Sequence, residues 1–289
     1  MSSIGLKDCK GNPMKFATAR NAVFAALGLA LVASACATHT RAKVPTYQVE
    51  TGSYHIVIPE GGATAGAVMH LHGAVATGLR ALRGDLAKEA LRRGYAVIAP
   101  NGEHADGRFR RNWAVRARGS NFARDDVAFL RDVLRDVRER HKVGTDRLLL
   151  TGFSRGASMA WDIACHDPDM ATAFAPVAGA FWTELPSGCE QPVHLFQTHG
   201  WTDKIVPLEG RVIPNSVLVQ GDLWASLFLL RDLNGCSARQ PERAVIESDR
   251  WWRYWTDCAE GSITLMLHPG AHRIPDDWPV EALDWFEGL

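Results

Sequence analysis

The sequence predicts an α/β fold with a mostly parallel central sheet and helices on both faces. From about residue 66 onward, short apolar runs rich in strand-forming residues alternate with longer segments of helical period. Gly or Pro stands at the ends of these runs, as expected where strands meet loops and helices. With 289 residues, 46% of them hydrophobic, the chain can bury the core of one large domain.

Each predicted element follows from a local pattern. Residues 47–58 alternate polar and apolar side chains, which is typical of an antiparallel strand pair at a sheet edge. Residues 122–140 place an apolar stripe beside Arg and Asp, which predicts a helix. Residues 101–121 are rich in Gly, Arg and Asn and have no clear period, so we expect a loop at the rim of a site. Buried strands are predicted at 67–71, 95–99, 147–151, 173–177, 193–198 and 263–267.

The N-terminal segment has the pattern of an export signal. Lys15 and Arg20 precede an apolar run, 22–35, that ends in Ala33-Ser34-Ala35 and is too short to span a bilayer comfortably. We therefore predict a removed signal peptide over 1–35 and a single catalytic domain over 36–289. Met14 begins a segment that resembles a complete signal, so an incorrect start at residues 1–13 stays open.

Cys36 and the balanced charge bear on location and partners. Cys36 directly follows the small residues and resembles the acylated cysteine of a bacterial lipoprotein, so secreted, periplasmic and lipid-anchored locations all stay open. The 32 basic and 32 acidic residues give no electrostatic reason to expect nucleic acid as a partner. The oligomeric state is not predicted.

Four cysteines remain in the predicted mature domain after Cys36, and they suit an oxidising compartment. They are Cys165, Cys189, Cys236 and Cys258. An even number in an exported chain predicts two disulfides, and sequence proximity favours Cys165 with Cys189 and Cys236 with Cys258. Buried free thiols are the alternative, and no cysteine spacing suggests a metal site.

The clearest motif is Gly152-Phe153-Ser154-Arg155-Gly156, between the predicted strand 147–151 and the helix-compatible run 157–164. A serine nucleophile in this context sits on a sharp strand-to-helix turn, where glycines let the strand and helix approach each other. We therefore predict Ser154 as a nucleophile. The alternative is a glycine-rich turn with a capping serine.

Such a serine needs a base to take its proton and an acid to orient that base. In folds with this turn, the acid and then the histidine follow the serine along the chain. Asp203 follows strand 193–198, and His272 lies in the last loop before the final helix, so we predict them as the acid and the base. A local turn is the alternative role for Asp203. His268 competes with His272 but ends strand 263–267, so we predict a structural role for it.

Backbone NH groups should hold the oxyanion that forms during attack. We predict the NH of Arg155, after the nucleophile, and the NH of Ala74, in the turn His72-Gly73-Ala74 after strand 67–71. His72 should orient this loop rather than act as a second base. His70 and His72 share one face of a strand, but no third ligand has matching spacing, so no metal site is predicted.

Several tryptophans fall near the predicted loops. Trp201, beside the acid loop, and Trp113 are the main candidates for contact with substrate, and Trp182 and Trp278 are further candidates. Packing in the core or at the rim is the alternative for each. A further cluster, Trp251, Trp252 and Trp255, is expected to cover a sheet edge.

Together these motifs resemble the polyhydroxybutyrate depolymerase-like esterases, a group that includes feruloyl and acetylxylan esterases. The matching stretches are Leu71-His72-Gly73, Asn112-Trp113, 125–130, 146–147 with 152–159, 175–179, His199-Gly200 with Asp203, 234–236 and 270–272. The resemblance implies an α/β-hydrolase fold and ester hydrolysis by a Ser-Asp-His triad without a metal or organic cofactor. Ala74 and Pro269-Gly270 depart from the usual pattern and leave the substrate open.

The predicted function is therefore an exported serine esterase that forms an acyl-enzyme. Its substrates would be small or polymeric esters of the polyhydroxyalkanoate, feruloyl or acetyl type. Two alternatives stay open, namely a serine peptidase on the same fold and a noncatalytic binding protein that kept the fold.

Overall fold

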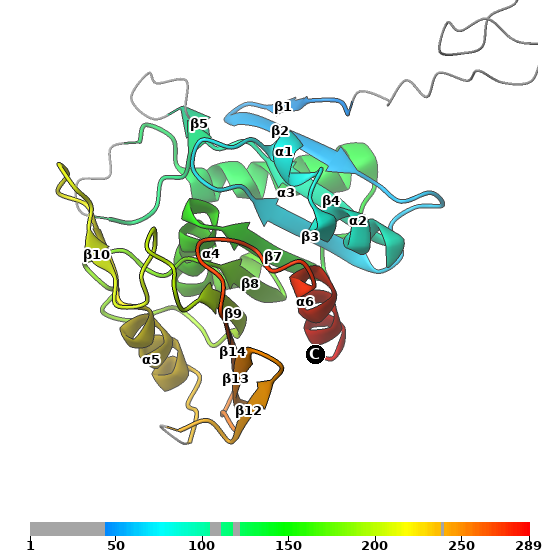
Figure 1. The fold of residues 1–289 in the computed structure, drawn as a ribbon. Coiled ribbons are helices and arrows are strands. Elements are labelled where there is room, and N and C mark those ends of the chain that lie inside the picture. The colour runs from blue at the N-terminus through cyan, green and yellow to red at the C-terminus, as the bar shows by residue number, and fades with distance from the viewer. Residues whose placement is uncertain (1–43, 105–110, 118–121, 238–239) are drawn as a thin grey trace, which may run out of the picture. The chain divides into compact units, whose positions relative to one another are not determined.

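A ten-stranded sheet organises the computed structural model, with the strands in the order β1-β2-β4-β3-β7-β8-β9-β14-β13-β12 (Figure 1). The structure describes residues 44–104, 111–117, 122–237 and 240–289. The predicted signal peptide, the start at Met14 and Cys36 lie outside these residues. Strands β4 to β14 in this order pair in parallel, whereas the pairs at both edges are antiparallel. The predicted mostly parallel sheet is confirmed.

The sheet strands have the following bounds: β1 Tyr47–Val49, β2 Gly52–Val57, β3 Gly66–Leu71, β4 Tyr95–Pro100, β7 Leu148–Phe153, β8 Ala173–Val177, β9 His194–Gly200, β12 Arg243–Glu247, β13 Arg250–Trp255 and β14 Ser262–His268. Two short hairpins join β5 Glu103–His104 to β6 Arg111–Asn112 and β10 Arg211–Val212 to β11 Val219–Gln220. The helices are α1 Gly78–Ala81, α2 Asp85–Arg92, α3 Asp126–His141, α4 Arg155–His166, α5 Leu223–Leu233 and α6 Trp278–Glu287, with a 3₁₀ turn at Pro168–Met170.

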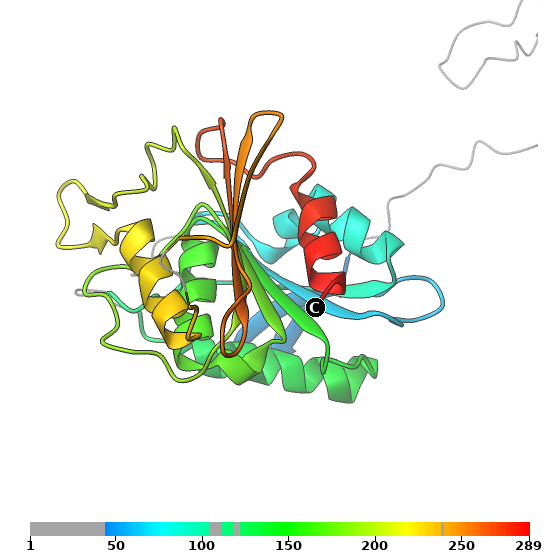
Figure 2. The same cartoon turned by 90° about the horizontal axis from the view of Figure 1, so that it is seen from below.

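Helices cover both faces of the sheet, as predicted. Figure 2 shows α3, α4 and α5 on one side of the strands and α1, α2 and α6 on the other. Two clusters of buried side chains, one on each face, correspond to these layers. Within the described part of the chain, no helix combines the length and apolar character needed to cross a membrane.

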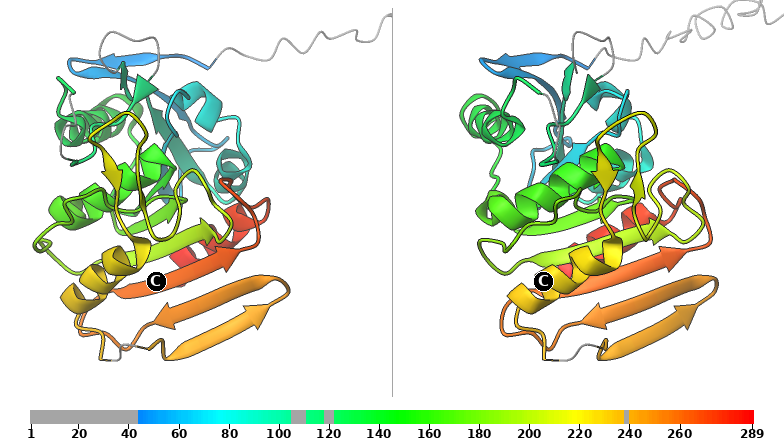
Figure 3. Two further views of the ribbon diagram at one scale, coloured as in Figure 1. Left: turned by 60° about the vertical axis from the view of Figure 1, so that its left-hand side comes forward. Right: turned by 90° about the vertical axis from the view of Figure 1, so that its left-hand side faces the viewer.

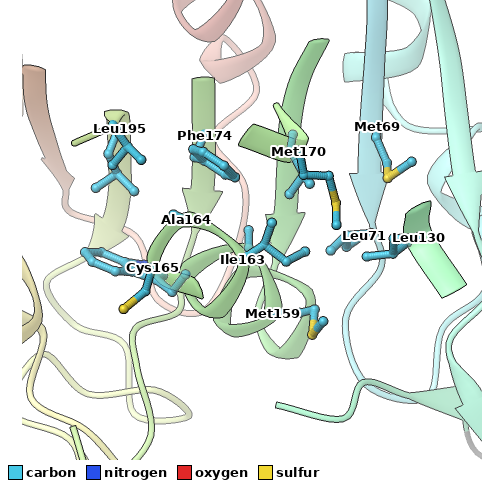
Figure 4. Packing of buried hydrophobic residues seen from close by; sticks show 14 of the residues in the cluster. Met69, Leu71, Leu130, Met159, Ile163, Ala164, Cys165, Met170, Phe174 and Leu195 are labelled. Atoms are coloured by element: carbon cyan, nitrogen blue, oxygen red, sulfur yellow. The ribbon is translucent and has the colours of Figure 1, made fainter. Parts of the chain in front are cut away.

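Alternation along the central strands divides the core between the two faces. In β3, Val68 belongs to the α2 and α6 side and Met69 to the α3 and α4 side. Figure 4 shows the core on the α3 and α4 side of the sheet, which includes Met159 and Ile163 of α4 and Leu71 of β3. Strands buried on both faces have continuous apolar sequences, which explains why these strands were predictable.

The sequence-based boundaries differ from the structure at identifiable points. The helix predicted at 122–140 begins at Asp126, because the Asp125 carboxylate accepts hydrogen bonds from the NH groups of Val127 and Ala128 and so caps the first turn. The loop predicted at 101–121 contains the short β5–β6 hairpin. The tryptophan cluster Trp251, Trp252 and Trp255 lies on β13, next to the edge strand β12 (Figure 3).

Two disulfides tie loops to the core. Cys165, at the end of α4, is bonded to Cys189 in the loop before β9. Cys236, after α5, is bonded to Cys258 in the loop between β13 and β14. These are the pairings that sequence proximity favours.

Replacing Cys165 and Cys189 with alanine should lower the free energy of unfolding by about 3 kcal/mol, because the bond restricts the unfolded chain across a sequence separation of 24 residues. Urea unfolding of the oxidised proteins measures this difference. The single variant Cys189→Ala keeps the buried Cys165 side chain and so separates loss of the bond from loss of packing. An unfolding midpoint unchanged in both variants would contradict a stabilising cross-link.

Candidate active site

Ser154 lies at the sharp turn between β7 and α4. Its backbone has φ 56° and ψ −119°, a conformation that costs an ordinary residue about 1–3 kcal/mol. Two hydrogen bonds hold this turn: the Ser154 NH donates to Val177 O at 2.9 Å, and the Ser158 NH donates to Ser154 O at 3.0 Å. The surrounding structure thus holds the serine in the conformation expected of a nucleophile elbow.

The two glycines of the motif allow a very close approach of backbones. A Cβ on Gly152 would lie 2.2 Å from Gly156 O, and a Cβ on Gly156 would lie 2.2 Å from Leu71 O. Any side chain here would push β7, α4 and the end of β3 apart. The spacing of the glycines therefore has the steric cause that the sequence suggested.

Asp203 and His272 are joined directly. Asp203 follows β9, and its Oδ2 accepts a hydrogen bond from His272 Nδ1 at 2.7 Å. Its other oxygen, Oδ1, accepts from the NH groups of Ile205 and Val206 at 2.8 and 2.9 Å. Because Nδ1 carries the proton, the neutral His272 ring presents Nε2 as an acceptor.

The environment of Asp203 keeps its carboxylate ionised. Burial alone would raise its pKa, but the neighbouring His199 and His272 rings and the Val206 NH outweigh burial and hold the pKa well below its ordinary value. Asp203 therefore places a negative charge next to His272 Nδ1, where it can stabilise an imidazolium.

The His272 ring lies beside the nucleophile elbow. Its centroid is 4.8 Å from that of Phe153, the residue before Ser154. The loops that carry the acid and the histidine also contact each other, since the Trp201 NH donates to His268 O and the Thr202 hydroxyl donates to Gly270 O, both at 3.0 Å. The structure thus brings the three predicted residues to one edge of the sheet.

His199 packs against Asp203, and no function was predicted for it from the sequence. Its Nδ1 accepts from Gln197 Nε2 at 3.0 Å, so its Nε2 carries the proton and donates to Val206 O at 2.8 Å. That Nε2 also lies 3.6 Å from Asp203 Oδ2. The ring fixes the turn that shapes the Asp203 site. A histidine close to the end of a predicted strand, four residues before Asp203, was the available signal.

The loop after β3 approaches Ser154 closely. A Cβ placed on Gly73 would lie 3.5 Å from the Ser154 Cβ. The His72 ring donates through Nδ1 to Gly73 O at 2.8 Å and accepts the Gly102 NH at Nε2 at 2.9 Å. Burial lowers the pKa of His72 to about 4, so the ring stays neutral and both bonds persist. His72 therefore orients this loop, in line with its predicted role.

Trp113 also holds this loop and has no exposed surface. Its Nε1 donates to His72 O at 2.7 Å, and its own carbonyl accepts from Arg155 Nε at 3.0 Å. The suggestion that Trp113 contacts substrate is therefore not supported, because neighbouring residues cover its ring completely. It connects the loop 101–121 to the loop after β3.

Two buried carboxylates fix the residues that follow Trp113. Asp126 accepts the Ala114 NH at 2.7 Å, and Asp162 accepts the Arg116 NH at 2.6 Å. Burial raises the pKa of Asp126 and raises that of Asp162 to about 7. The described part of loop 101–121 is thus attached to α3 and α4.

Arg155 and Ala74, whose NH groups are predicted to hold the oxyanion, directly follow Ser154 and Gly73 in the chain. Arg155 is the first residue of α4, where a backbone NH has no partner within the helix. Ala74 directly follows Gly73 and is exposed. The Arg155 side chain itself is buried, with its guanidinium 4.4 Å from the centre of the Trp182 ring.

The other tryptophans divide by exposure. Trp182 and Trp278 are buried with their indole NH groups bonded to Ser158 and Thr198, so packing is their role in this structure. Trp201 is partly exposed, and its ring lies 5.2 Å from that of Trp251. Trp201 is thus accessible to solvent, and contact with substrate stays a prediction for it.

The two histidines considered as metal ligands bond to protein groups. His70 Nδ1 lies 2.6 Å from Thr151 Oγ1, and both nitrogens of His72 are occupied as described above. Across the described ranges, no group of three or more His, Cys, Asp or Glu side chains is arranged to hold a metal ion.

A cavity of about 270 Å³ opens beside the elbow, on the α2 and α6 face of the sheet. Gly73 and Phe153 form one wall, and Ile274 and Pro275, after His272, form another. Ser154 and His272 do not line this cavity themselves, but Phe153 directly precedes Ser154 in the chain, and a Cβ on Gly73 would lie 3.5 Å from the Ser154 Cβ.

The sheet topology and the elbow define an α/β-hydrolase fold, and comparison with solved structures agrees. The acetyl xylan esterase from Aspergillus awamori superposes with a TM-score of 0.62 at 15% identity, covering 86% of this chain and 100% of that one. The Bacillus cereus carboxylesterase gives a TM-score of 0.56 at 13% identity, covering 81% and 93%.

In sequence, the chain is similar to curated feruloyl esterases. Feruloyl esterase C of Emericella nidulans is 31% identical over 128 residues, which cover 43% of this chain and 42% of that protein. The probable feruloyl esterase C of Aspergillus niger is 26% identical over 188 residues, 64% of this chain and 59% of its own length. The chain thus spans about half the length of these relatives. No family model matches the sequence.

Acid should destabilise the protein through His268, which is 1% exposed and whose pKa is lowered to about 4 by burial and by the nearby charges of Arg273 and Arg250. The unfolded chain takes up this proton below about pH 6.5 and the folded protein only near pH 4, so stability is lost as the pH falls between these values. This loss should reach about 2 kcal/mol at pH 5.

Urea unfolding at several pH values measures this effect. His268→Asn keeps an acceptor for the Gly270 NH, which His268 Nδ1 binds at 3.0 Å, but cannot titrate. Its stability should therefore fall less steeply between pH 7 and 5. Equal slopes for variant and wild type would show that His268 does not contribute.

Proposed function

We propose that this protein is a serine hydrolase of carboxylic esters. The observation that carries the proposal is the 2.7 Å hydrogen bond between Asp203 and His272, placed beside the strained turn at Ser154. Similarity to feruloyl esterases supports ester substrates. An α/β-hydrolase fold alone would support many activities, so the site and the sequence relatives decide the choice.

In the proposed reaction, His272 Nε2 takes the proton of the Ser154 hydroxyl as its oxygen attacks the ester carbonyl. The Arg155 and Ala74 NH groups hold the resulting oxyanion. His272 then gives the proton to the leaving alcohol, and the acyl group stays on Ser154. Water, activated by the same ring, releases the acid. Asp203 stabilises the transient imidazolium throughout.

The proposal extends to export, and feruloyl, acetyl and hydroxyalkanoate esters are the substrate types to compare. Two disulfides support an oxidising compartment for the mature protein. A removed signal over 1–35 and a lipid anchor at Cys36 concern residues outside the described part of the chain.

A fluorophosphonate should label the wild type at Ser154 and leave Ser154→Ala unlabelled. Ser158→Ala is the matched control, because Ser158 lies one turn along α4 and bonds only structural partners, so this variant should be labelled. Asp203→Asn should react about 10³-fold more slowly, since the imidazole loses its orienting charge. Mass spectrometry and labelling rates provide the measurement.

The outcomes separate the alternatives. An unlabelled, folded wild type would favour a noncatalytic binding protein. Labelling with faster turnover of peptides than of feruloyl, acetyl and short-chain esters would identify a peptidase instead.

Trp113→Phe should reduce kcat about tenfold on an activated ester with little change in KM, because it removes the hydrogen bond to His72 O and loosens the loop that carries the Ala74 NH. Trp278→Phe is the matched control, since it removes a hydrogen bond of 2.9 Å from another fully buried indole, to Thr198. Steady-state kinetics and thermal unfolding of both variants test this. Equal losses of kcat at equal stability would contradict a role for Trp113 in positioning the loop.

A further inference from the structure

The cavity beside the elbow contains one buried polar side chain that the proposed reaction does not use. His70 lines the cavity, is 8% exposed, and lies on β3 two residues before His72. Its Nδ1 is paired with Thr151 on the neighbouring strand β7. No described residue forms a hydrogen bond with its Nε2.

The hydrogen bonds around Thr151 determine which nitrogen of His70 carries the proton. The Thr151 hydroxyl donates its single proton to Met69 O at 3.3 Å. With the hydroxyl proton directed to Met69 O, the Thr151 oxygen accepts from His70 Nδ1–H at 2.6 Å, and Nε2 is left as an unprotonated acceptor. Burial lowers the pKa of His70 to about 4, so the ring is neutral at neutral pH.

The rest of the cavity combines apolar walls with a charged outer end. Phe153, Leu86, Ile274 and Pro279 supply apolar surface, whereas Arg80, Asp85 and Asp276 line it from exposed positions. A volume of about 270 Å³ suits one ring or a short branched chain. An apolar group inside would leave the His70 acceptor unpaired, but a group with a hydroxyl would satisfy it.

We propose that this cavity is a substrate subsite in which His70 Nε2 accepts a hydrogen bond from a hydroxyl group of the ester. The inference rests on the proposed ester hydrolysis and makes His70 a determinant of specificity. Gly73 and Phe153 line the cavity and lie next to Ser154, so one ester molecule can extend from the cavity to the Ser154 hydroxyl. The hydroxyl can belong to the acyl or to the alcohol part.

Two pairs of esters distinguish these sources. Methyl 4-hydroxycinnamate against methyl cinnamate tests the acyl part, and 2-(4-hydroxyphenyl)ethyl acetate against 2-phenylethyl acetate tests the alcohol part. In one of these two pairs, the kcat/KM of the wild type should be about fivefold higher for the hydroxylated ester than for its partner, which is the effect of one neutral hydrogen bond.

Two variants of His70 separate its two nitrogens. His70→Asn retains a donor to Thr151 but removes the acceptor facing the cavity, so the ratio of kcat/KM within that pair should fall to about one. His70→Gln places an amide oxygen near the position of Nε2 and should restore the preference. His194→Asn is the matched control, because His194 Nδ1 also pairs with a hydroxyl, that of Ser262, at the opposite end of the strands. It should keep the wild-type ratio.

The proposal fails if neither pair shows a preference, or if His70→Asn keeps it. Calorimetric binding of 4-hydroxycinnamate against cinnamate, and of 4-ethylphenol against ethylbenzene, gives a second test that needs no turnover. If no ester is hydrolysed, the proposed function fails, and a hydroxyl preference in binding that His70→Asn abolishes would still support the subsite. Equal affinities within each pair would overturn it.

Discussion

Four parallel strands, β3, β7, β9 and β14, end at one edge of the sheet, and every part of the candidate site follows one of these ends. The loop after β3 carries Ala74, the turn after β7 carries Ser154 and Arg155, and the loops after β9 and β14 carry Asp203 and His272. For these loops to meet, the backbone of α4 must lie in van der Waals contact with the end of β3. Gly156, whose missing side chain lets α4 approach Leu71 O, makes this approach possible.

Buried histidines whose two ring nitrogens both form hydrogen bonds support this edge. His72 and His199 each use one nitrogen as a donor and the other as an acceptor, so each ring joins two backbone or side-chain groups that would otherwise lie unpaired. The hydrogen-bond partners fix which nitrogen of each of these two rings carries a proton. The His272 ring, which is more exposed, is hydrogen-bonded to Asp203 through Nδ1.

Much of this arrangement could be predicted from the sequence, since it depends on local signals. The strand and helix order, the elbow at Ser154 and the positions of Asp203 and His272 follow from apolar runs, glycine spacing and chain order. The supporting contacts could not be predicted, because they depend on pairs far apart in the chain. For Trp113 the sequence left substrate contact and packing as alternatives, and in the structure tertiary packing covers the ring completely and bonds it to His72 O.

Buried polar side chains of α3 and α4 hold an irregular segment of the loop 101–121 in place. Asp126 and Asp162 accept backbone NH groups of Ala114 and Arg116, and Arg155 donates to Trp113 O. Breaking any of these buried hydrogen bonds would leave a polar group without a partner, so this segment is fixed although it has almost no regular structure. Its Trp113 then bonds the loop beside Ser154. The position of that loop therefore depends on side chains of α3 and α4 that take no part in the proposed reaction.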